Sequence, residues 1–520
     1  MLRILTLLCV LSLSCESLGQ DDYLRSIKIN LAKTDGEINR FYNLSVGAGR
    51  ANEGMRADWR QQLAEVHRDA GFRYIRMHGL LTDDMAVYRI DDKGQDQFNF
   101  QYVDDLYDYI LSIGMKPFVE LSFMPNALAS GEQTVFWWRG NVTPPHSYEK
   151  WGALVKTLTQ HFTNRYGAKE VESWYFEVWN EPNLEGFWQG SQADYFKLYE
   201  YAANAVKSVN PNYKVGGPAT AGAAWITDTI GFCVANDVPL DFVSSHSYGV
   251  SQGFLDEYGT TGTVLANEER AITNDILKNR EEITRSSMPA LPLHYTEWST
   301  SYTPADPIHD SYHSAAYILQ KIKQVGDAAQ SMSYWTFTDI FEEAGPRYEV
   351  FHGGFGLMNM QGIKKPSYFA FQFLNDLEKV SLQNEDKQSF ASKSQNGDVH
   401  VLLWDYTYTL PKKTNNQQFY NRLQKPREKG NVQLNLDGLI KGRYQLQIAQ
   451  VGFRKNDAYS EYIDMGSPNQ LTRRQVEKLK KTATGAPHTT RIIRIDKSGR
   501  FDLELPLREN DVYSVKLTRL

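Results

Sequence analysis

The sequence predicts an α/β fold in which a (β/α)8 TIM barrel is joined to a C-terminal β-sandwich domain. Between residues 40 and 375, eight short β-like runs alternate with longer segments whose apolar residues recur at helical spacing. After about residue 376 the pattern changes to short alternating strands separated by Gly, Asn and Asp. The chain has 520 residues, 41% of them hydrophobic, which is enough for a large core and more than one domain usually needs.

The barrel prediction depends on eight strands, each followed by a helix-sized segment. The strands are expected at 44–49, 72–79, 116–123, 174–181, 213–219, 240–248, 291–299 and 332–340. Amphipathic helices are expected between them, for example at 55–71, 102–114, 148–167 and 193–210. An open, doubly wound sheet is the alternative, but eight regular units over about 330 residues favour a closed barrel.

The sandwich is predicted over residues 376–520, and the barrel over residues 20–375. The strands of the sandwich are expected at 400–406, 431–436, 443–451, 490–507 and 511–520, with one helical insertion at 472–483. The early strand at 25–32 can join the same sheet. We interpret the sandwich as a structural partner of the barrel, with an independent sugar-binding module as the alternative.

Residues 1–19 are typical of a signal peptide. Arg3 gives a basic start, residues 4–13 form an apolar run too short to span a bilayer, and small residues follow at 17–19. We therefore expect a secreted or periplasmic protein whose mature chain begins near Gln20. Lipid anchoring at Cys15 is the alternative, and it is disfavoured because Ser12 stands where an aliphatic residue is usual.

Composition excludes several classes of partner and cofactor. The formal charge of −6 comes without a long basic stripe, so neither nucleic acid nor an anionic membrane surface is an expected partner. Removal of the leader leaves one cysteine, Cys233, so no intramolecular disulfide is expected. No Cys/His cluster has zinc spacing and no phosphate loop is present, so we expect no metal and no cofactor. The sequence leaves homo-oligomer formation open.

In a barrel of this kind, polar residues at the C-terminal ends of the strands project into the mouth, where the active site forms. The sequence places such residues after five of the strands. They are His78 after the second, Asn180 and Glu181 after the fourth, His246 and Tyr248 after the sixth, Glu297 after the seventh, and Trp335, Glu342 and Glu343 after the eighth. We expect all of them on one face of the barrel.

Two of these residues suggest the chemistry. Glu181 stands among tryptophans in WYFEVWNEPNLEGFW, and an aromatic, partly desolvated setting raises a carboxyl pKa, which suits a general acid. Glu297 in HYTEW provides a second carboxylate, and two carboxylates flanking one bond are the apparatus of glycoside hydrolysis. A single Glu at a strand end is more often a salt-bridge partner, but a pair on the fourth and seventh strands favours function.

Several longer motifs narrow the hypothesis to one family. They are RYIRMHGLL, KPFVELSFMPNALASG, FEVWNEPN, SSHSYG, YTEWS, YWTFTDIFEE and FHGGFGLMNMQGIKKPSYFAF. Together they resemble glycoside hydrolase family 39, the family of β-xylosidases and α-L-iduronidases, and the resemblance continues more weakly into the sandwich.

The resemblance implies a role for each site residue. Glu181 would be the acid/base and Glu297 the nucleophile of a retaining, double-displacement mechanism. Asn180 would bind the sugar 2-hydroxyl, while His78, His246 and Tyr248 would line the subsite of the terminal sugar. Trp335 would form a stacking wall, Glu342 and Glu343 would accept hydrogen bonds from ring hydroxyls, and Phe136 would close one side, with Trp137 and Trp138 as alternatives for that place.

Charge favours a neutral sugar as the substrate. A uronic acid needs cationic partners, yet residues 244–252 and 334–343 contain no Lys or Arg, and Glu342 and Glu343 would repel it. We therefore expect an exo-acting β-xylosidase that releases terminal xylosyl residues from xylo-oligosaccharides or related plant glycans. The alternatives are hydrolysis of an α-L-iduronide or α-L-arabinoside, endo action, and a barrel that binds carbohydrate without catalysis.

Overall fold

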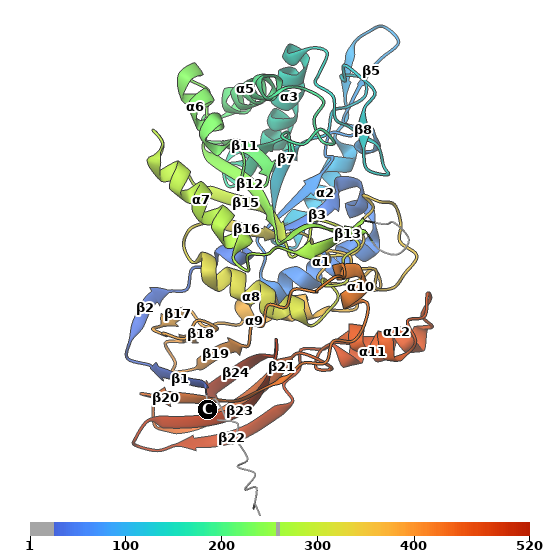
Figure 1. Ribbon diagram of the computed structural model, residues 1–520. Coiled ribbons are helices and arrows are strands. Elements are labelled where there is room, and N and C mark those ends of the chain that lie inside the picture. The colour runs from blue at the N-terminus through green and yellow to red at the C-terminus, as the bar shows by residue number, and fades with distance from the viewer. Residues whose placement is uncertain (1–24, 256–260) are drawn as a thin grey trace, which may run out of the picture.

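The computed structural model describes residues 25–255 and 261–520, and it consists of a barrel and a sandwich (Figure 1). In Figure 1 the barrel forms the upper part of the molecule and the sandwich the lower part. The predicted leader, with Cys9 and Cys15, lies outside the described residues. No described helix is both long enough and apolar enough to cross a membrane.

The barrel is closed by eight parallel strands, and all eight predicted strands are confirmed. They are β3 (Ser45–Arg50), β4 (Tyr74–His78), β7 (Lys116–Leu121), β10 (Tyr175–Val178), β11 (Lys214–Ala221), β12 (Phe242–Tyr248), β15 (Leu293–Ser299) and β16 (Ser331–Tyr334). The surrounding helices are α1 (Ala57–Ala70), α2 (Gln101–Ser112), α3 (Tyr148–Tyr166), α4 (Ala168–Val171), α5 (Gln192–Val209), α6 (Ile226–Asn236), α7 (Ala271–Arg285), α8 (His313–Val325) and α9 (Pro366–Asn375). The open-sheet alternative is therefore wrong.

Short elements lie outside the eight barrel strands, several of them in the loops after these strands. Three are 3-10 helices, η1 (Phe41–Asn43), η2 (Ala51–Met55) and η3 (Asp83–Met85). Three are small hairpins, β5 (Tyr88–Ile90) with β6 (Asp96–Phe98), β8 (Thr134–Val135) with β9 (Gly140–Asn141), and β13 (Val250–Leu255) with β14 (Thr261–Leu265).

The interior of the barrel is layered from an aromatic floor to a charged centre. Near the N-terminal ends of the strands, Phe118 stacks on Tyr175 with ring centroids 4.9 Å apart. Two residues later on their strands come Glu120 and Glu177, which are fully buried beside Arg76. The residues predicted for the mouth come next along the strands. The charged groups of the barrel core therefore lie directly beneath them.

A β-bulge in β15 sets the direction of the residues that follow it. Ser245 of β12 pairs with Tyr295, but the next residue, His246, pairs with Glu297, so Thr296 is an extra residue in the ladder. Regular alternation would place Thr296 and Glu297 on opposite faces of the sheet. With the bulge, both side chains reach the barrel interior, where Thr296 bonds Glu177 and Glu297 bonds Arg76.

The sandwich contains a seven-stranded and a three-stranded sheet. The first has the order β2 (Thr34–Glu37), β17 (Val380–Leu382), β18 (Ser389–Lys393), β19 (Val399–Trp404), β24 (Val512–Arg519), β21 (Gly442–Val451) and β22 (Thr489–Ile495). The second has the order β1 (Arg25–Asn30), β20 (Glu428–Asp437) and β23 (Arg500–Arg508). Its helices are α10 (Asn416–Tyr420), α11 (Ala458–Asp464) and α12 (Arg473–Thr482). Alternating apolar residues of both sheets, such as Val432 and Leu446, form their shared core.

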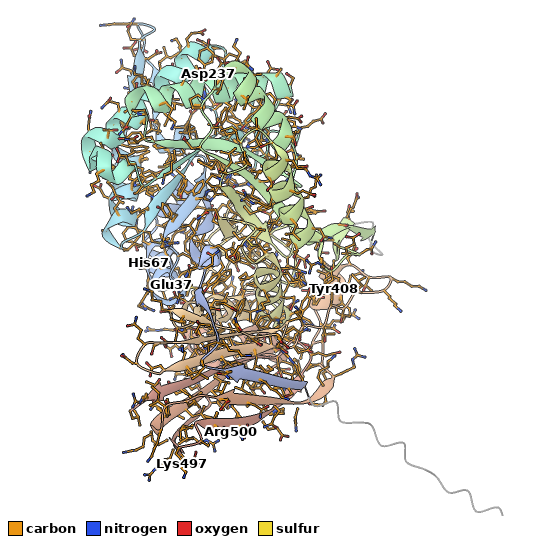
Figure 2. The ribbon with its side chains drawn as sticks, turned by 90° about the vertical axis from the view of Figure 1, so that its left-hand side faces the viewer. Glu37, His67, Asp237, Tyr408, Lys497 and Arg500 are labelled. Atoms are coloured by element: carbon orange, nitrogen blue, oxygen red, sulfur yellow. The ribbon has the colours of Figure 1, made fainter. Side chains whose placement is uncertain are left out.

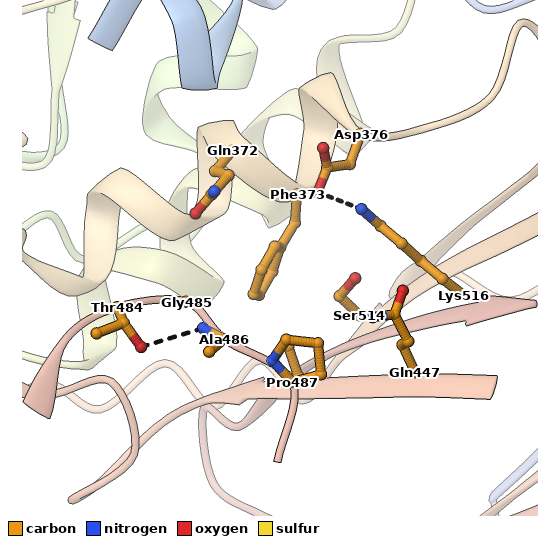
Figure 3. A pocket seen from close by; sticks show the side chains of 11 residues that line it. Gln372, Phe373, Asp376, Gln447, Thr484, Gly485, Ala486, Pro487, Ser514 and Lys516 are labelled. Atoms are coloured by element: carbon orange, nitrogen blue, oxygen red, sulfur yellow. Dashed lines mark hydrogen bonds and ion pairs between the residues drawn. The ribbon is translucent and has the colours of Figure 1, made fainter. Parts of the chain in front are cut away.

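The sandwich packs on the barrel through α8, α9 and the seven-stranded sheet (Figure 1). Trp404 of this sheet is buried in the barrel core and donates its indole N–H to Gln320 of α8 at 3.0 Å. Just after α9, Asp376 pairs with Lys516 at 2.5 Å (Figure 3). Figure 2 shows Lys497 and Arg500 at the end of the sandwich farthest from the barrel. The continuous core supports the interpretation of the sandwich as a structural partner.

Candidate active site

A cavity of about 430 Å³ lies at the C-terminal ends of the barrel strands, where the sequence predicts the site. Eight of the ten predicted site residues line it, namely His78, Phe136, Asn180, Glu181, Tyr248, Glu297, Trp335 and Glu343. The other two do not line it. His246 is fully buried behind Glu181, and the carboxylate of Glu342 pairs with Arg50.

The two predicted catalytic carboxylates approach each other closely. An oxygen of Glu181 and an oxygen of Glu297 lie within 4.8 Å. Retaining glycosidases hold their carboxyl groups about 5 to 5.5 Å apart, whereas inverting enzymes separate them by about 6.5 to 9.5 Å to admit a water. The spacing in this cavity therefore suits the retaining geometry.

Glu181 is placed by a tight turn after β10. Trp179 and Glu181 both have left-handed backbone conformations, with φ of 72° and 45°, and the Glu181 N–H donates to Ala219 O at 2.9 Å. The residue is 8% exposed, and its carboxylate contacts His246, with Oε1 at 2.9 Å from Nδ1. Burial, followed by the charge of Glu297, raises the pKa of Glu181 well above its usual value. A carboxyl group in this environment can hold a proton near neutral pH.

Glu297 is held by a hydrogen bond to each of its oxygens. Arg76 donates to Oε1 at 2.7 Å, and the Tyr248 hydroxyl donates to Oε2 at 2.6 Å. The two donors fix the position and orientation of the carboxylate. Glu297 is thus suited to act as a nucleophile, while Glu181 retains its proton.

Arg76 was not among the predicted site residues, although it organises the centre of the site. Its guanidinium is fully buried and contacts Glu120 at 2.9 Å and Glu177 at 2.5 Å, in addition to Glu297. It also donates to Asn180 Oδ1 at 2.9 Å, which leaves the Asn180 amide N–H groups to donate into the cavity. The sequence signal was an arginine in the middle of a buried strand, since such a charge requires partners.

His78 and two aromatic rings form one wall of the cavity. His78 Nδ1 lies 2.8 Å from Glu120 Oε2, which fixes the orientation of the imidazole. Its ring packs against Trp335 and Phe136, with centroids 4.7 Å and 5.8 Å apart. The flat faces of this wall can stack on a sugar ring.

Of the three neighbouring aromatic residues, the structure places Phe136 in the lining of the cavity. Trp138 packs against Phe136 at 5.2 Å, behind the lining, and Trp137 is 57% exposed. The backbone N–H of Trp137 donates to the backbone carbonyl oxygen of Glu343 at 2.7 Å. This bond joins the loops after β7 and β16 at the mouth.

Glu342 does not face the cavity, in contrast to its predicted role in binding ring hydroxyls. Its carboxylate pairs with Arg50, at 2.6 Å, and is 3.6 Å from Arg56. The prediction did not consider Arg50, the last residue of β3. Arg50 is far from Glu342 in the sequence but contacts it in the folded chain. A carboxylate already paired with a guanidinium has little reason to turn toward a neutral sugar.

Glu343 does face the cavity, and its Oε1 lies 3.6 Å from His78 Nε2. Burial, followed by the charge of Glu297, raises the pKa of Glu343 well above its usual value. The two leading causes, burial and the charge of Glu297, are the same for Glu181 and Glu343.

The rest of the lining was not predicted. These residues are Leu184, Phe187, Ala221, Gly222, Val250, Asp275, Tyr302 and Phe355. Most come from loops rather than strand ends, where sequence periodicity gives no direction to a side chain. They complete the lining of the cavity that holds the catalytic pair.

Glu181, His246 and Glu297 also have the spacing to ligate a cation. Both Glu297 oxygens, however, already accept hydrogen bonds, one of them from the Arg76 guanidinium. A metal ion would have to displace or approach this fixed positive charge, so the donor set does not fit a metal site.

Comparisons with known proteins match the whole architecture. The model of the family "Glycosyl hydrolases family 39" matches residues 25–500. A β-xylosidase of Caldicellulosiruptor saccharolyticus is 41% identical over 465 residues, covering 88% of this chain and 92% of its own. A β-xylosidase of Geobacillus stearothermophilus is 38% identical over 502 residues, covering 93% and 94%. The crystal structure of a monomeric β-xylosidase from Caulobacter crescentus CB15 superposes with a TM-score of 0.93 at 42% identity, covering 95% of this chain and 100% of its own.

Proposed function

This chain belongs to glycosyl hydrolase family 39, and we propose that it is an exo-acting β-xylosidase that releases terminal β-D-xylosyl residues with retention of configuration. The observation that carries the proposal is the close carboxyl pair, one member bound by Arg76 and Tyr248 and the other buried beside His246. Relatives named β-xylosidase, at 38% and 41% identity over most of the chain, support the substrate.

In the first step, Glu297 attacks the anomeric carbon while Glu181 gives its proton to the departing oxygen. This forms a covalent glycosyl-enzyme. In the second step, Glu181 takes a proton from water, and the resulting attack releases the sugar and Glu297. The Asn180 amide is placed to donate to the sugar 2-hydroxyl, a bond that strengthens in the transition state.

The charge of the cavity supports a neutral sugar. Among the residues that the structure describes, the lining includes four acids, Glu181, Asp275, Glu297 and Glu343, but no lysine or arginine. Arg50 is occupied by Glu342 and by Asp84, and is therefore not free to bind a uronate. A substrate carboxylate would enter a negative cavity without a cationic partner.

The proposed substrate is tested with Glu343→Ala and its neighbour Glu342→Ala. Removal of Glu343 deletes a hydrogen-bonding group from the sugar subsite, so kcat/KM on an aryl β-xyloside should fall by roughly ten- to a hundredfold. Glu342→Ala should cost much less, since its carboxylate bonds Arg50 outside the lining. The wild type should hydrolyse the β-xyloside in preference to the corresponding α-L-iduronide.

The same measurements can contradict the proposal. A wild type that prefers the iduronide would show that the cavity accommodates a carboxylate. Equal losses for the two variants would show that Glu343 has no particular place in the sugar subsite.

We further propose that the enzyme acts outside the cytoplasm, on oligosaccharides released from plant glycans. The signal-peptide pattern of residues 1–19 supports this location. Mass spectrometry of the protein expressed with its leader would give the first residue of the mature chain, expected near Gln20, and would reveal a lipid on Cys15 if one were attached.

A further inference from the structure

Behind Glu181, four buried side chains form an unbroken chain of hydrogen bonds. Glu181 Oε1 lies 2.9 Å from His246 Nδ1, and His246 Nε2 lies 3.1 Å from Thr296 Oγ1. The Thr296 hydroxyl lies 2.8 Å from Glu177 Oε1. His246, Thr296 and Glu177 are all fully buried, so the geometry of the chain is set by the protein rather than by solvent.

Glu177, at the opposite end of this series of hydrogen bonds from Glu181, determines which atom donates in each bond. Burial raises the pKa of Glu177, but Arg76 Nε donates to Glu177 Oε2 at 2.5 Å, and this buried ion pair holds Glu177 as a carboxylate that accepts hydrogen bonds. The Thr296 hydroxyl has one proton, which it therefore donates to Glu177. The Thr296 oxygen is then an acceptor, so the His246 nitrogen facing it must carry a proton.

We propose that Thr296 is a positioning residue, which fixes His246 in the tautomer protonated on Nε2, so that Nδ1 accepts a hydrogen bond from the acid form of Glu181. The proposal rests on the glycosidase function given above and adds a residue that does not touch the substrate. The bulge that brings Thr296 into the barrel interior also precedes Glu297, which lines the cavity.

This arrangement affects both steps of the reaction. When Glu181 gives its proton to the leaving oxygen, the Nδ1 lone pair is left facing a carboxylate oxygen without a proton between them. That contact favours return of a proton, so the carboxylate is a stronger base toward the water of the second step. His246 retains its own proton on Nε2 throughout, and the proton that leaves Glu181 is replaced by one from water.

Other charges also act on Glu181 and must be held constant in a test. They come from Glu297 on β15, Arg76 on β4 and Glu120 on β7. The other titratable groups around Glu181 and His246 are His78 on β4, Glu177 on β10, Glu343 after β16 and Asp275 of α7. Burial lowers the pKa of His246 well below its usual value, in agreement with a neutral imidazole. A useful variant therefore changes the hydroxyl of Thr296 and no charge.

Thr296→Val is such a variant, and Thr296→Ser is its matched control. Valine keeps the branched shape but cannot accept from Nε2, so His246 is free to move its proton to Nδ1 and donate to ionised Glu181. The basic limb of the kcat/KM profile on xylobiose should then move down by about one pH unit, with roughly a tenfold loss above it. Dinitrophenyl β-xyloside, whose leaving group needs little protonation, should lose much less kcat/KM, and the serine variant should behave as the wild type.

Nitrogen NMR of selectively labelled histidine provides a readout that does not depend on activity. In the wild type, His246 should show the Nε2–H tautomer, and in Thr296→Val it should not. An Nδ1–H tautomer in the wild type would overturn the inference even if the enzyme proved to be a retaining xylosidase. A basic limb that stays in place or rises in Thr296→Val, or equal losses on both substrates, would overturn it as well.

Discussion

Glu297→Ala should lose hydrolysis of every β-xyloside, whatever the leaving group, by at least about four orders of magnitude in kcat. The variant removes the atom that forms the glycosyl-enzyme, and Arg76 and Tyr248, which bind the carboxylate, cannot replace it as a nucleophile. Added azide can occupy the vacated space and attack an activated substrate directly. The product should then be the α-xylosyl azide, with inverted configuration, identified by NMR.

Arg76 has to be considered in interpreting that result. Loss of Glu297 leaves a buried guanidinium with two of its three carboxylate partners, so the variant should be checked for folding by thermal unfolding. Glu297→Gln keeps the volume and one acceptor oxygen and is the matched control. Substantial hydrolysis by both folded variants without azide would mean that another residue is the nucleophile.

Glu181→Ala should have an effect that depends on the leaving group. Cleavage of xylobiose requires protonation of a sugar oxygen, so its kcat/KM should fall by roughly 10² to 10⁴-fold. Dinitrophenyl β-xyloside should still form the glycosyl-enzyme, which then accumulates because no base activates water. Azide should release it as the β-xylosyl azide, and the rate of that release should lose the basic limb of the wild-type pH profile.

The raised pKa of Glu181 predicts how activity changes on the basic side of the pH profile. Glu181 is active when protonated, and its pKa is raised, so activity of the wild type on xylobiose should persist above the usual range of a carboxyl group and fall as the pH rises through the raised value. If Glu181→Ala lost the same activity on xylobiose and on the dinitrophenyl substrate, Glu181 would not be the acid.

The strands of the barrel could be predicted from the sequence because their buried runs are short and separated by amphipathic helices. KPFVELSF and β7, for example, coincide at Lys116 and differ by two residues at the other end. The rule that strand ends form the mouth then located seven of the sixteen lining residues. Such reasoning depends only on position along a strand, and it is reliable where the strand is regular.

The rest of the site depends on interactions between distant segments. Arg50 is 292 residues from Glu342, and only the closed barrel brings the two together. The bulge at Thr296 leaves no mark in the alternation of LPLHYTEWS, so the inward direction of both Thr296 and Glu297 could not be derived from period two. Loop residues such as Leu184 and Tyr302 carry no periodic signal at all.

Proton NMR of the wild-type reaction tests the central claim most directly. The xylose released from an aryl β-xyloside is followed from the first minutes, before mutarotation mixes its anomers. The close pair of Glu181 and Glu297 predicts that β-xylose appears first and α-xylose follows by mutarotation. Initial release of α-xylose would show a single displacement by water, and would contradict the assignment of Glu297 as a nucleophile.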